Sequence, residues 1–161
     1  MIKGCMFDLF EVIIKEFNSN EVKPFDPKSI TPDDLTDGFL VFLKELKNKG
    51  IQIAVVSDYP FLKEVLDRLR ITHLINIYLS KDQIDNSVMD LYHSAASLLN
   101  LKPKEFLLFK NEDKIEETIN VGKFNVIKVG MNNSSNNGYK QIIDFSSVKF
   151  NQLVSSISNL N

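Results

Sequence analysis

The chain has 161 residues, of which 43% are hydrophobic and 25% are charged, and its formal net charge is −2. This size fits one domain with its own hydrophobic core, so we expect a single domain over residues 1–161. The charge balance shows no basic excess, which argues against nucleic-acid binding. No apolar run reaches the length of about 18 residues that a membrane-spanning helix needs.

The single cysteine, Cys5, falls inside the first expected strand. A disulfide framework is therefore excluded, and a reducing compartment is favoured. A core strand that begins at Ile2 leaves no room for a cleavable signal peptide. We accordingly expect a cytoplasmic protein.

Short β-branched or aromatic runs alternate with longer helical patterns along the chain. The expected strands cover residues 2–7, 51–56, 74–79, 105–109 and 125–129. The first expected helix begins near Thr31 and stops at Gly50, and the others cover about 60–69, 88–99, 113–121 and 150–159. This alternation predicts a three-layer, Rossmann-like α/β fold, with about five parallel strands and helices on both faces of the sheet.

Two segments interrupt the alternation. Residues 11–25 are typical of a small hairpin flap, with its turn at residues 18–20, where the sequence reads Asn-Ser-Asn. Residues 130–138 are rich in asparagine, serine and glycine, which predicts a mobile surface loop.

The first expected strand is followed directly by Asp8, in the sequence Gly-Cys-Met-Phe-Asp-Leu-Phe over residues 4–10. This segment resembles the opening motif of the haloacid dehalogenase (HAD) superfamily, DxDx[TV], whose first Asp is the nucleophile and whose second is the general acid/base. Asp8 matches the first position, and Phe10 stands at the second. With three further segments, 50–60, 85–99 and 106–130, the resemblance is closest to the beta-phosphoglucomutase-like branch and implies a HAD-type core.

The second motif of that family is a hydroxyl residue that holds the transferring phosphoryl group, and Ser57 matches it, with Asp58 beside it. A serine at the carboxyl end of a buried parallel strand lies where open α/β sheets bind ligands, so we expect both residues to line the pocket. The alternative role for Ser57 is to cap the helical segment that starts near Tyr59.

The third motif supplies a lysine, and Asn86 occupies its place. A neutral amide can hydrogen-bond a phosphate oxygen, but it does not neutralise the charge of a carboxylate nucleophile. Lys81 and Lys110 are the two lysines that remain open as replacements, although Lys81 also suits a solvated surface position.

The fourth motif supplies acidic Mg²⁺ ligands, and here Lys110 and Asn111 stand in their place. A lysine close to Asp8 competes with a bound cation, so we expect no cofactor. If the protein is catalytic, Asp8, Glu112 and Asp113 are the candidate Mg²⁺ ligands. The alternative for the two later acids is that they favour the amino end of a helix.

Too few residues separate the first strand from the helix near Thr31 to form the helical cap of beta-phosphoglucomutases. Cap-less members of the superfamily act on macromolecules or close their sites with a neighbouring subunit. The resemblance therefore implies a protein partner or a homo-oligomer, which contacts the hairpin 11–25 and the mouth of the sheet. Phe10, Tyr59 and Phe61 are candidate contact residues there.

We favour a HAD-like protein with eroded phosphatase motifs, which serves as a non-catalytic binding or assembly module. In this interpretation Lys110 pairs with Asp8 and replaces the missing cation. The competing hypothesis is a weak or atypical phosphohydrolase, with Asp8 as nucleophile and with Ser57 and Asn86 holding the phosphate. A third interpretation is a metal-independent dehalogenase, with Asn111 in its motif-four position. Such enzymes need two cationic residues, a lysine in the third motif and an arginine from the cap, and this chain matches neither.

Overall fold

The computed structural model describes residues 1–15, 25–83, 88–111, 123–130 and 139–158, and all structural statements below concern these ranges. The expected helix 113–121 and nearly all of the expected loop 130–138 lie outside them.

Six parallel strands form one sheet, in the order β3-β2-β1-β4-β5-β6. The strands are β1 (Gly4–Asp8), β2 (Gln52–Ser57), β3 (Ile77–Ser80), β4 (Phe106–Asn111), β5 (Asn125–Val129) and β6 (Lys140–Ile142). The predicted parallel α/β sheet is therefore confirmed. The sequence did not reveal β6, because it has only three residues and its first two, Lys140 and Gln141, are exposed and polar.

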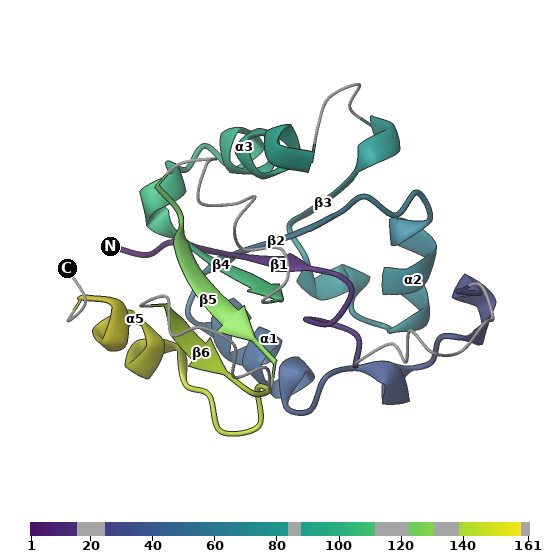
Figure 1. Ribbon diagram of the computed structural model, residues 1–161, viewed down its shortest axis with the longest axis horizontal. Coiled ribbons are helices and arrows are strands. Elements are labelled where there is room, and N and C mark those ends of the chain that lie inside the picture. Colours follow the sequence, from purple (N-terminus) through teal and green to yellow (C-terminus); the bar gives the residue numbers. More distant parts are fainter. Residues whose placement is uncertain (16–24, 84–87, 112–122, 131–138, 159–161) are drawn as a thin grey trace.

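Helices cover both faces of this sheet. They are α1 (Phe39–Asn48), α2 (Leu62–Arg68), α3 (Val88–Leu98) and α5 (Phe150–Ser158). Apolar residues of α1, α2 and α5 share one core cluster with one face of the sheet, whereas α3 packs on the opposite face. Figure 1 shows α3 above the sheet and α1 and α5 below it. None of the described helices is long and apolar enough to cross a membrane.

The core on the α1 face is strongly aromatic. Phe7 of β1 stacks on Phe109 of β4, with ring centroids 4.7 Å apart. Edge contacts to Phe39, Phe42 and Phe145 surround this pair. Phe7, Phe39 and Phe109 are fully buried. This cluster packs β1 against α1 and thereby fixes the position of the carboxyl end of β1, where Asp8 lies.

Helix α1 begins later than the sequence predicts. Thr31 and Asp34 form a capping box, in which the Thr31 backbone N–H donates to Asp34 Oδ2 at 2.8 Å, but they cap only a 3-10 turn, Pro32–Asp34. The chain then passes through Gly38, whose φ of 77° is left-handed, before α1 starts at Phe39. A side chain at Gly38 would meet the Phe145 backbone at 2.4 Å, so this break is imposed by tertiary packing.

The described part of the segment after β1 pairs with the chain that precedes α1. Ile14 forms an antiparallel bridge with Leu35, and the Lys15 N–H donates to the Asp34 carbonyl at 2.9 Å. The described part of 11–25 therefore pairs with the chain just before α1, because Val12, Ile13 and Ile14 are all buried in the core there. The expected turn and most of the returning arm, residues 16–24, lie outside the described ranges. Between β1 and α1 the described residues form 3-10 turns and no helical cap.

Candidate functional site

Asp8 ends β1, in the middle of the sheet, with β2 on one side and β4 on the other. The carboxyl ends of parallel strands are the edge at which open α/β sheets bind ligands. The Asp8 side chain is 13% exposed, so it lies just below the surface of this edge. The sequence prediction for the position of Asp8 agrees with the structure.

A three-residue network joins Asp8 to Tyr92 and Lys110. The Tyr92 hydroxyl donates to Asp8 Oδ1 at 2.7 Å, and Lys110 Nζ donates to the Tyr92 hydroxyl oxygen at 2.6 Å. The same ammonium lies 3.5 Å from Asp8 Oδ2. It also lies 4.5 Å from the centroid of the Tyr92 ring, close enough for a cation–π contact. Both carboxylate oxygens of Asp8 thus have a donor or a cation from the protein.

The local structure explains how these groups meet. Lys110 follows Phe109 on β4, and since side chains alternate along a strand, it lies on the face opposite the aromatic core. That face is covered by α3, which presents Tyr92 together with Leu91, Ala95 and other small or apolar residues. The Lys110 side chain is only 1% exposed. Its charge is therefore stabilised within the protein, and the pairing of Lys110 with Asp8 predicted from the sequence is confirmed.

Sequence reasoning missed two residues here. Tyr92 lies three and four residues before the buried Ala95 and Ala96, and this helical spacing was the available signal for its inward position. Lys128 of β5 lies in register with Lys110 and is also buried, with its Nζ 5.6 Å from the centroid of the Tyr139 ring. Its position inside an expected buried strand was the corresponding signal.

Ser57 is buried at the end of β2, and its hydroxyl oxygen contacts the turn that leads to α2, a helix whose N-cap residue is Phe61 and not Ser57. The Tyr59 backbone N–H donates to Ser57 Oγ at 3.1 Å. Asp58, between them, is exposed. Asn111 ends β4 and its amide Nδ2 lies 3.5 Å from the Val129 carbonyl oxygen.

Replacing Ser57 with alanine removes this acceptor from the chain entering α2. We expect Ser57→Ala to lower the free energy of unfolding by about 1 kcal/mol, the usual net contribution of one hydrogen bond within a protein. Urea unfolding followed by circular dichroism measures this change. Ser57→Thr retains the hydroxyl and serves as the control. An unchanged stability of Ser57→Ala would show that this hydrogen bond does not stabilise the fold.

The position of the second motif aspartate is filled by an aromatic cluster. Phe10 contacts Phe25 and Tyr59 edge-on, with ring centroids 5.1 and 5.5 Å apart. Phe25 and Tyr59 contact each other in the same way at 5.1 Å. Rings this close leave no room for a ligand between them, so Phe10 contributes packing rather than a proton donor.

The remaining candidates do not join this network within the described ranges. Lys81 is exposed and opens the 3-10 turn Lys81–Gln83 after β3. Asn86, Glu112 and Asp113 lie outside the described residues.

The resemblance implies Mg²⁺ beside Asp8, and the residues of this chain can be tested against that requirement. Among the described residues, no group of three or more His, Cys, Asp or Glu side chains is placed to hold a metal ion. The Lys110 ammonium already lies 3.5 Å from Asp8 Oδ2. Magnesium prefers oxygen ligands and is repelled by an adjacent cation. The described donor set therefore does not fit Mg²⁺.

No protein-family model and no curated protein sequence matches this chain. Solved structures do match. The beta-phosphoglucomutase from Clostridium difficile has a TM-score of 0.82 at 15% identity, over 99% of this chain and 98% of that one. A HAD-superfamily hydrolase from Ehrlichia chaffeensis has a TM-score of 0.66 at 17% identity, over 99% and 98%. One from Geobacter sulfurreducens has a TM-score of 0.73 at 10% identity, over 91% and 97%. This chain therefore has the fold of the HAD-superfamily hydrolases, including beta-phosphoglucomutases.

Proposed function

We propose that this chain is a non-catalytic binding or assembly module that keeps the HAD fold after its phosphatase motifs have eroded. The observation that carries the proposal is the contact of Asp8 with Tyr92 and Lys110. Oδ1 accepts from the Tyr92 hydroxyl at 2.7 Å and Oδ2 lies 3.5 Å from the Lys110 ammonium. The carboxylate is thereby held as one half of an internal ion pair.

An ion pair of this kind hinders Asp8 from acting as a nucleophile in phosphoryl transfer. The attacking oxygen must be directed at phosphorus, and a cation must offset the charge of the phosphate. A divalent cation bound to Oδ2 would share that oxygen with the Lys110 ammonium 3.5 Å away. Like charges this close repel each other by several kcal/mol in a partly buried site. Cation binding at Asp8 would therefore require Lys110 to move.

The usual proton donor for the leaving group is also absent from its position in the motif. General acid catalysis needs a proton donor within hydrogen-bond reach of the departing oxygen. The corresponding position is Phe10, whose ring packs against Phe25 and Tyr59. An apolar ring neither donates nor accepts the proton, so this step of the family's mechanism has no group at its usual position.

A weak phosphohydrolase that uses Asp8 is the second candidate, and one observation favours it. The Asp8 carboxylate remains partly exposed at the strand end, and Lys110 places a positive charge beside it. A lysine in that position resembles the third-motif lysine in its effect, because it offsets the negative charge of an incoming phosphate.

Hydrolysis of p-nitrophenyl phosphate in the presence of Mg²⁺ separates the two candidates. We expect the wild-type protein and Asp8→Asn to release p-nitrophenol at the same background rate. Asp8→Asn removes one oxygen anion and preserves the size of the side chain, so it controls for contaminating phosphatases. Hydrolysis by the wild type that disappears in Asp8→Asn would refute the non-catalytic role.

Beryllofluoride provides a second readout that does not depend on a good substrate, because it forms a stable mimic of an aspartyl phosphate. We expect ¹⁹F NMR of the protein with Mg²⁺ and beryllofluoride to show no protein-bound signal. A bound signal that is absent in Asp8→Asn would establish Asp8 as a working nucleophile.

A further inference from the structure

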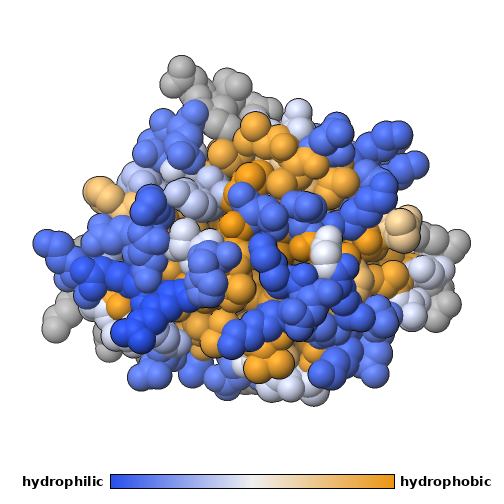
Figure 2. Space-filling model, turned by 180° about the vertical axis from the view of Figure 1, so that it is seen from behind, coloured by the Kyte–Doolittle hydropathy of each residue, from blue (hydrophilic) through white to orange (hydrophobic). Residues whose placement is uncertain are grey.

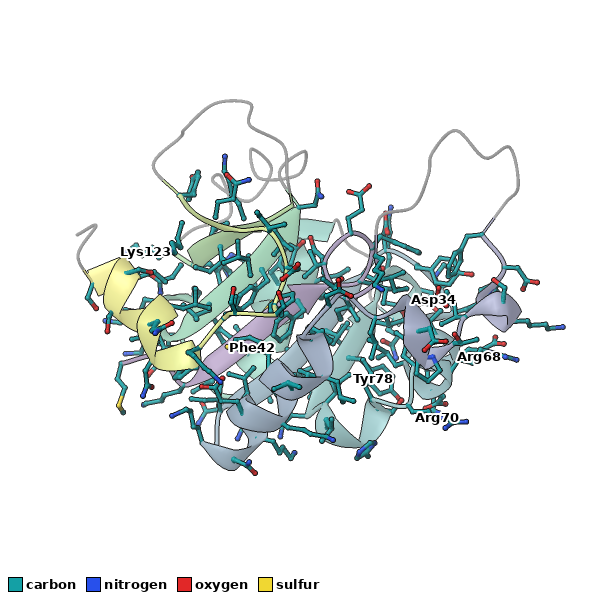
Figure 3. All side chains as sticks on the ribbon, turned by 90° about the horizontal axis from the view of Figure 1, so that it is seen from below. Asp34, Phe42, Arg68, Arg70, Tyr78 and Lys123 are labelled. Carbon is teal, nitrogen blue, oxygen red and sulfur yellow. The ribbon has the colours of Figure 1, made fainter. Side chains whose placement is uncertain are left out.

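Lysines lead into four neighbouring strands of the sheet. Strand β1 begins directly after Lys3, and β2, β4 and β5 begin within three residues of Lys49, Lys104 and Lys123. Because these parallel strands lie side by side in the order β2-β1-β4-β5, their amino ends share one edge, opposite the edge that carries Asp8. Figure 3 shows Lys123 on the side from which the strands start. We name the lysines of this edge the amino-edge patch, and they are Lys3, Lys49, Lys102, Lys104 and Lys123.

Hydrogen bonds hold the starts of these strands in one row. The Gln52 N–H donates to the Lys3 carbonyl at 2.9 Å, and the Lys3 N–H donates to the Glu105 carbonyl at 2.8 Å. The side-chain amide of Asn125 donates to the Lys104 carbonyl at 2.9 Å. Neighbouring strands lie about 4.8 Å apart, so four strand starts span about 14 Å. All the lysines of the amino-edge patch are exposed along this row.

The described acid that lies among these lysines is already paired. Glu105 Oε1 lies 2.9 Å from Lys3 Nζ, and Oε2 accepts from the Lys102 backbone N–H at 2.8 Å. These contacts, the backbone one first, lower the pKa of Glu105, so this side chain stays ionised and offsets one lysine charge. Within the described ranges no ion pair joins the other lysines of the patch to an acid. The amino-edge patch therefore keeps an excess of positive charge.

Acids on the nearby helices have partners of their own. Glu45, on α1, accepts from the Phe150 backbone N–H at 3.2 Å, so its carboxylate is directed at α5. Asp67, on α2, has its Oδ2 2.7 Å from Lys63 Nζ. Helix α5 carries no charged residue over Phe150–Ser158. None of these elements therefore neutralises the amino-edge patch.

An open groove of about 640 Å³ adjoins the patch, between the end of α3 and the turn that enters β4. Lys3, His93 and Lys102 line it, and its apolar lining comes from α3 and from the loop that follows this helix. Leu98, in the last turn of α3, is 65% exposed. Figure 2 shows hydrophobic residues gathered toward the top of the molecule, where α3 lies in Figure 1. The amino edge thus offers apolar contact beside positive charge.

We propose that the amino-edge patch binds an acidic segment of a protein partner, which lies extended across the starts of β2, β1, β4 and β5. Opposite charge selects this partner, because an anionic segment is attracted along the whole row and a basic one is repelled. Alternate side chains of an extended segment face the same way at intervals of about 6.8 Å, so a few Asp or Glu residues at such positions match a lysine row about 14 Å long. The groove suits an apolar side chain next to those acids.

Nucleic acid is the other polyanion that a row of lysines attracts, and two observations favour a protein. The amino-edge patch has no aromatic side chain on which bases stack. The chain as a whole has a formal net charge of −2, so its wider surface repels a long polyanion. The inference rests on the binding role proposed above and names the partner of that role by its chemistry.

Fluorescence anisotropy tests the proposal with a labelled peptide of about ten residues in which Glu and Val alternate, so that the acids share one face when the peptide is extended. We expect the wild-type protein to bind this peptide, and to bind it more weakly as the salt concentration rises. The triple variant Lys102→Gln, Lys104→Gln and Lys123→Gln is expected to raise the dissociation constant at least about tenfold, because it loses three exposed charge contacts.

Two further triple variants serve as controls. Lys28→Gln, Lys81→Gln and Lys149→Gln remove the same total charge from exposed lysines outside the patch, and we expect the dissociation constant to stay unchanged. Arginine in place of Lys102, Lys104 and Lys123 keeps the charge of the patch, so binding should be preserved. Thermal melts by circular dichroism establish that each variant is folded.

Several outcomes would overturn the proposal. One is a wild type that does not bind the peptide at low salt, and another is equal weakening in the patch variant and in the control variant with glutamine. Tighter binding of a labelled oligothymidylate of the same charge would assign the patch to nucleic acid. Self-association in sedimentation velocity that disappears in the patch variant would assign it to a second copy of the chain.

These outcomes are separable from those of the catalytic tests, because the amino-edge patch and Asp8 lie at opposite edges of the sheet. A failed peptide titration without phosphatase activity would defeat the patch and leave the non-catalytic role intact. Peptide binding together with Asp8-dependent hydrolysis would do the reverse.

Discussion

Lys110→Met is expected to lower the free energy of unfolding by about 3 kcal/mol, the cost of removing one partner from a buried ion pair. Methionine has a length and volume close to those of lysine, so the substitution removes the charge with little change in packing. The ammonium it deletes is 1% exposed and lies 3.5 Å from Asp8 Oδ2 and 2.6 Å from the Tyr92 hydroxyl oxygen. The substitution leaves the partly buried Asp8 carboxylate without this cation.

A double-mutant cycle with Asp8→Asn identifies the cause. If the loss arises from the ion pair, the double variant should lose less stability than the sum of the two single variants, because neither charge remains uncompensated. Urea unfolding at neutral pH measures all four proteins. Strict additivity would show that Lys110 stabilises the fold through contacts other than that with Asp8.

A surface ion pair provides the control for this cycle. Lys63 Nζ lies 2.7 Å from Asp67 Oδ2 on α2, but both side chains are well exposed. Solvent screens such a pair, so Lys63→Met should have only a small effect on stability. Comparing the stability losses of Lys110→Met and Lys63→Met shows whether the effect depends on the burial of the ion pair or only on the loss of a lysine.

Phe7→Ala is expected to lower the free energy of unfolding by about 4 kcal/mol, within the range for truncating a buried phenylalanine to alanine. Phe7 is fully buried and its ring contacts Phe39, Phe42, Phe109 and Phe145. These neighbours come from three separate parts of the core, namely α1, β4 and the segment between β6 and α5, so the surrounding structure has little freedom to close the cavity.

Leu40→Ala is the control for Phe7→Ala. Leu40 follows Phe39 in α1 but is 37% exposed, so its truncation leaves no cavity and should cost less than about 1 kcal/mol. Urea unfolding of both variants gives the comparison. A loss for Phe7→Ala no larger than that for Leu40→Ala would mean that the aromatic cluster repacks freely.

The sequence predicts the alternation of strands and helices because the spacing of apolar residues within each segment indicates its type of secondary structure. Five strands and four helices of the structure correspond to expected elements. The exceptions depend on distant residues. The start of α1 depends on the Phe145 backbone beside Gly38, and Ile14, in the segment after β1, pairs with Leu35.

The candidate site likewise has residues that the sequence predicts and a residue that depends on distant packing. Asp8 and Lys110 were identified because each directly follows an apolar strand run and because the sheet brings the ends of β1 and β4 together. Tyr92 was not identified, since the side chain that bridges them comes from a helix 84 residues away from Asp8 in the sequence. No local pattern states which helix covers which face of a sheet.

By itself, the sequence determined the class of fold, the position of Asp8 at the mouth of the sheet and the absence of acids at the neighbouring motif positions 110 and 111. These features follow from periodicity and from residue identity, which are local. Only the tertiary structure decided that Lys110 is buried against Asp8 and that Tyr92 joins them. Burial and pairing depend on which segments pack together, and packing is a property of the whole chain.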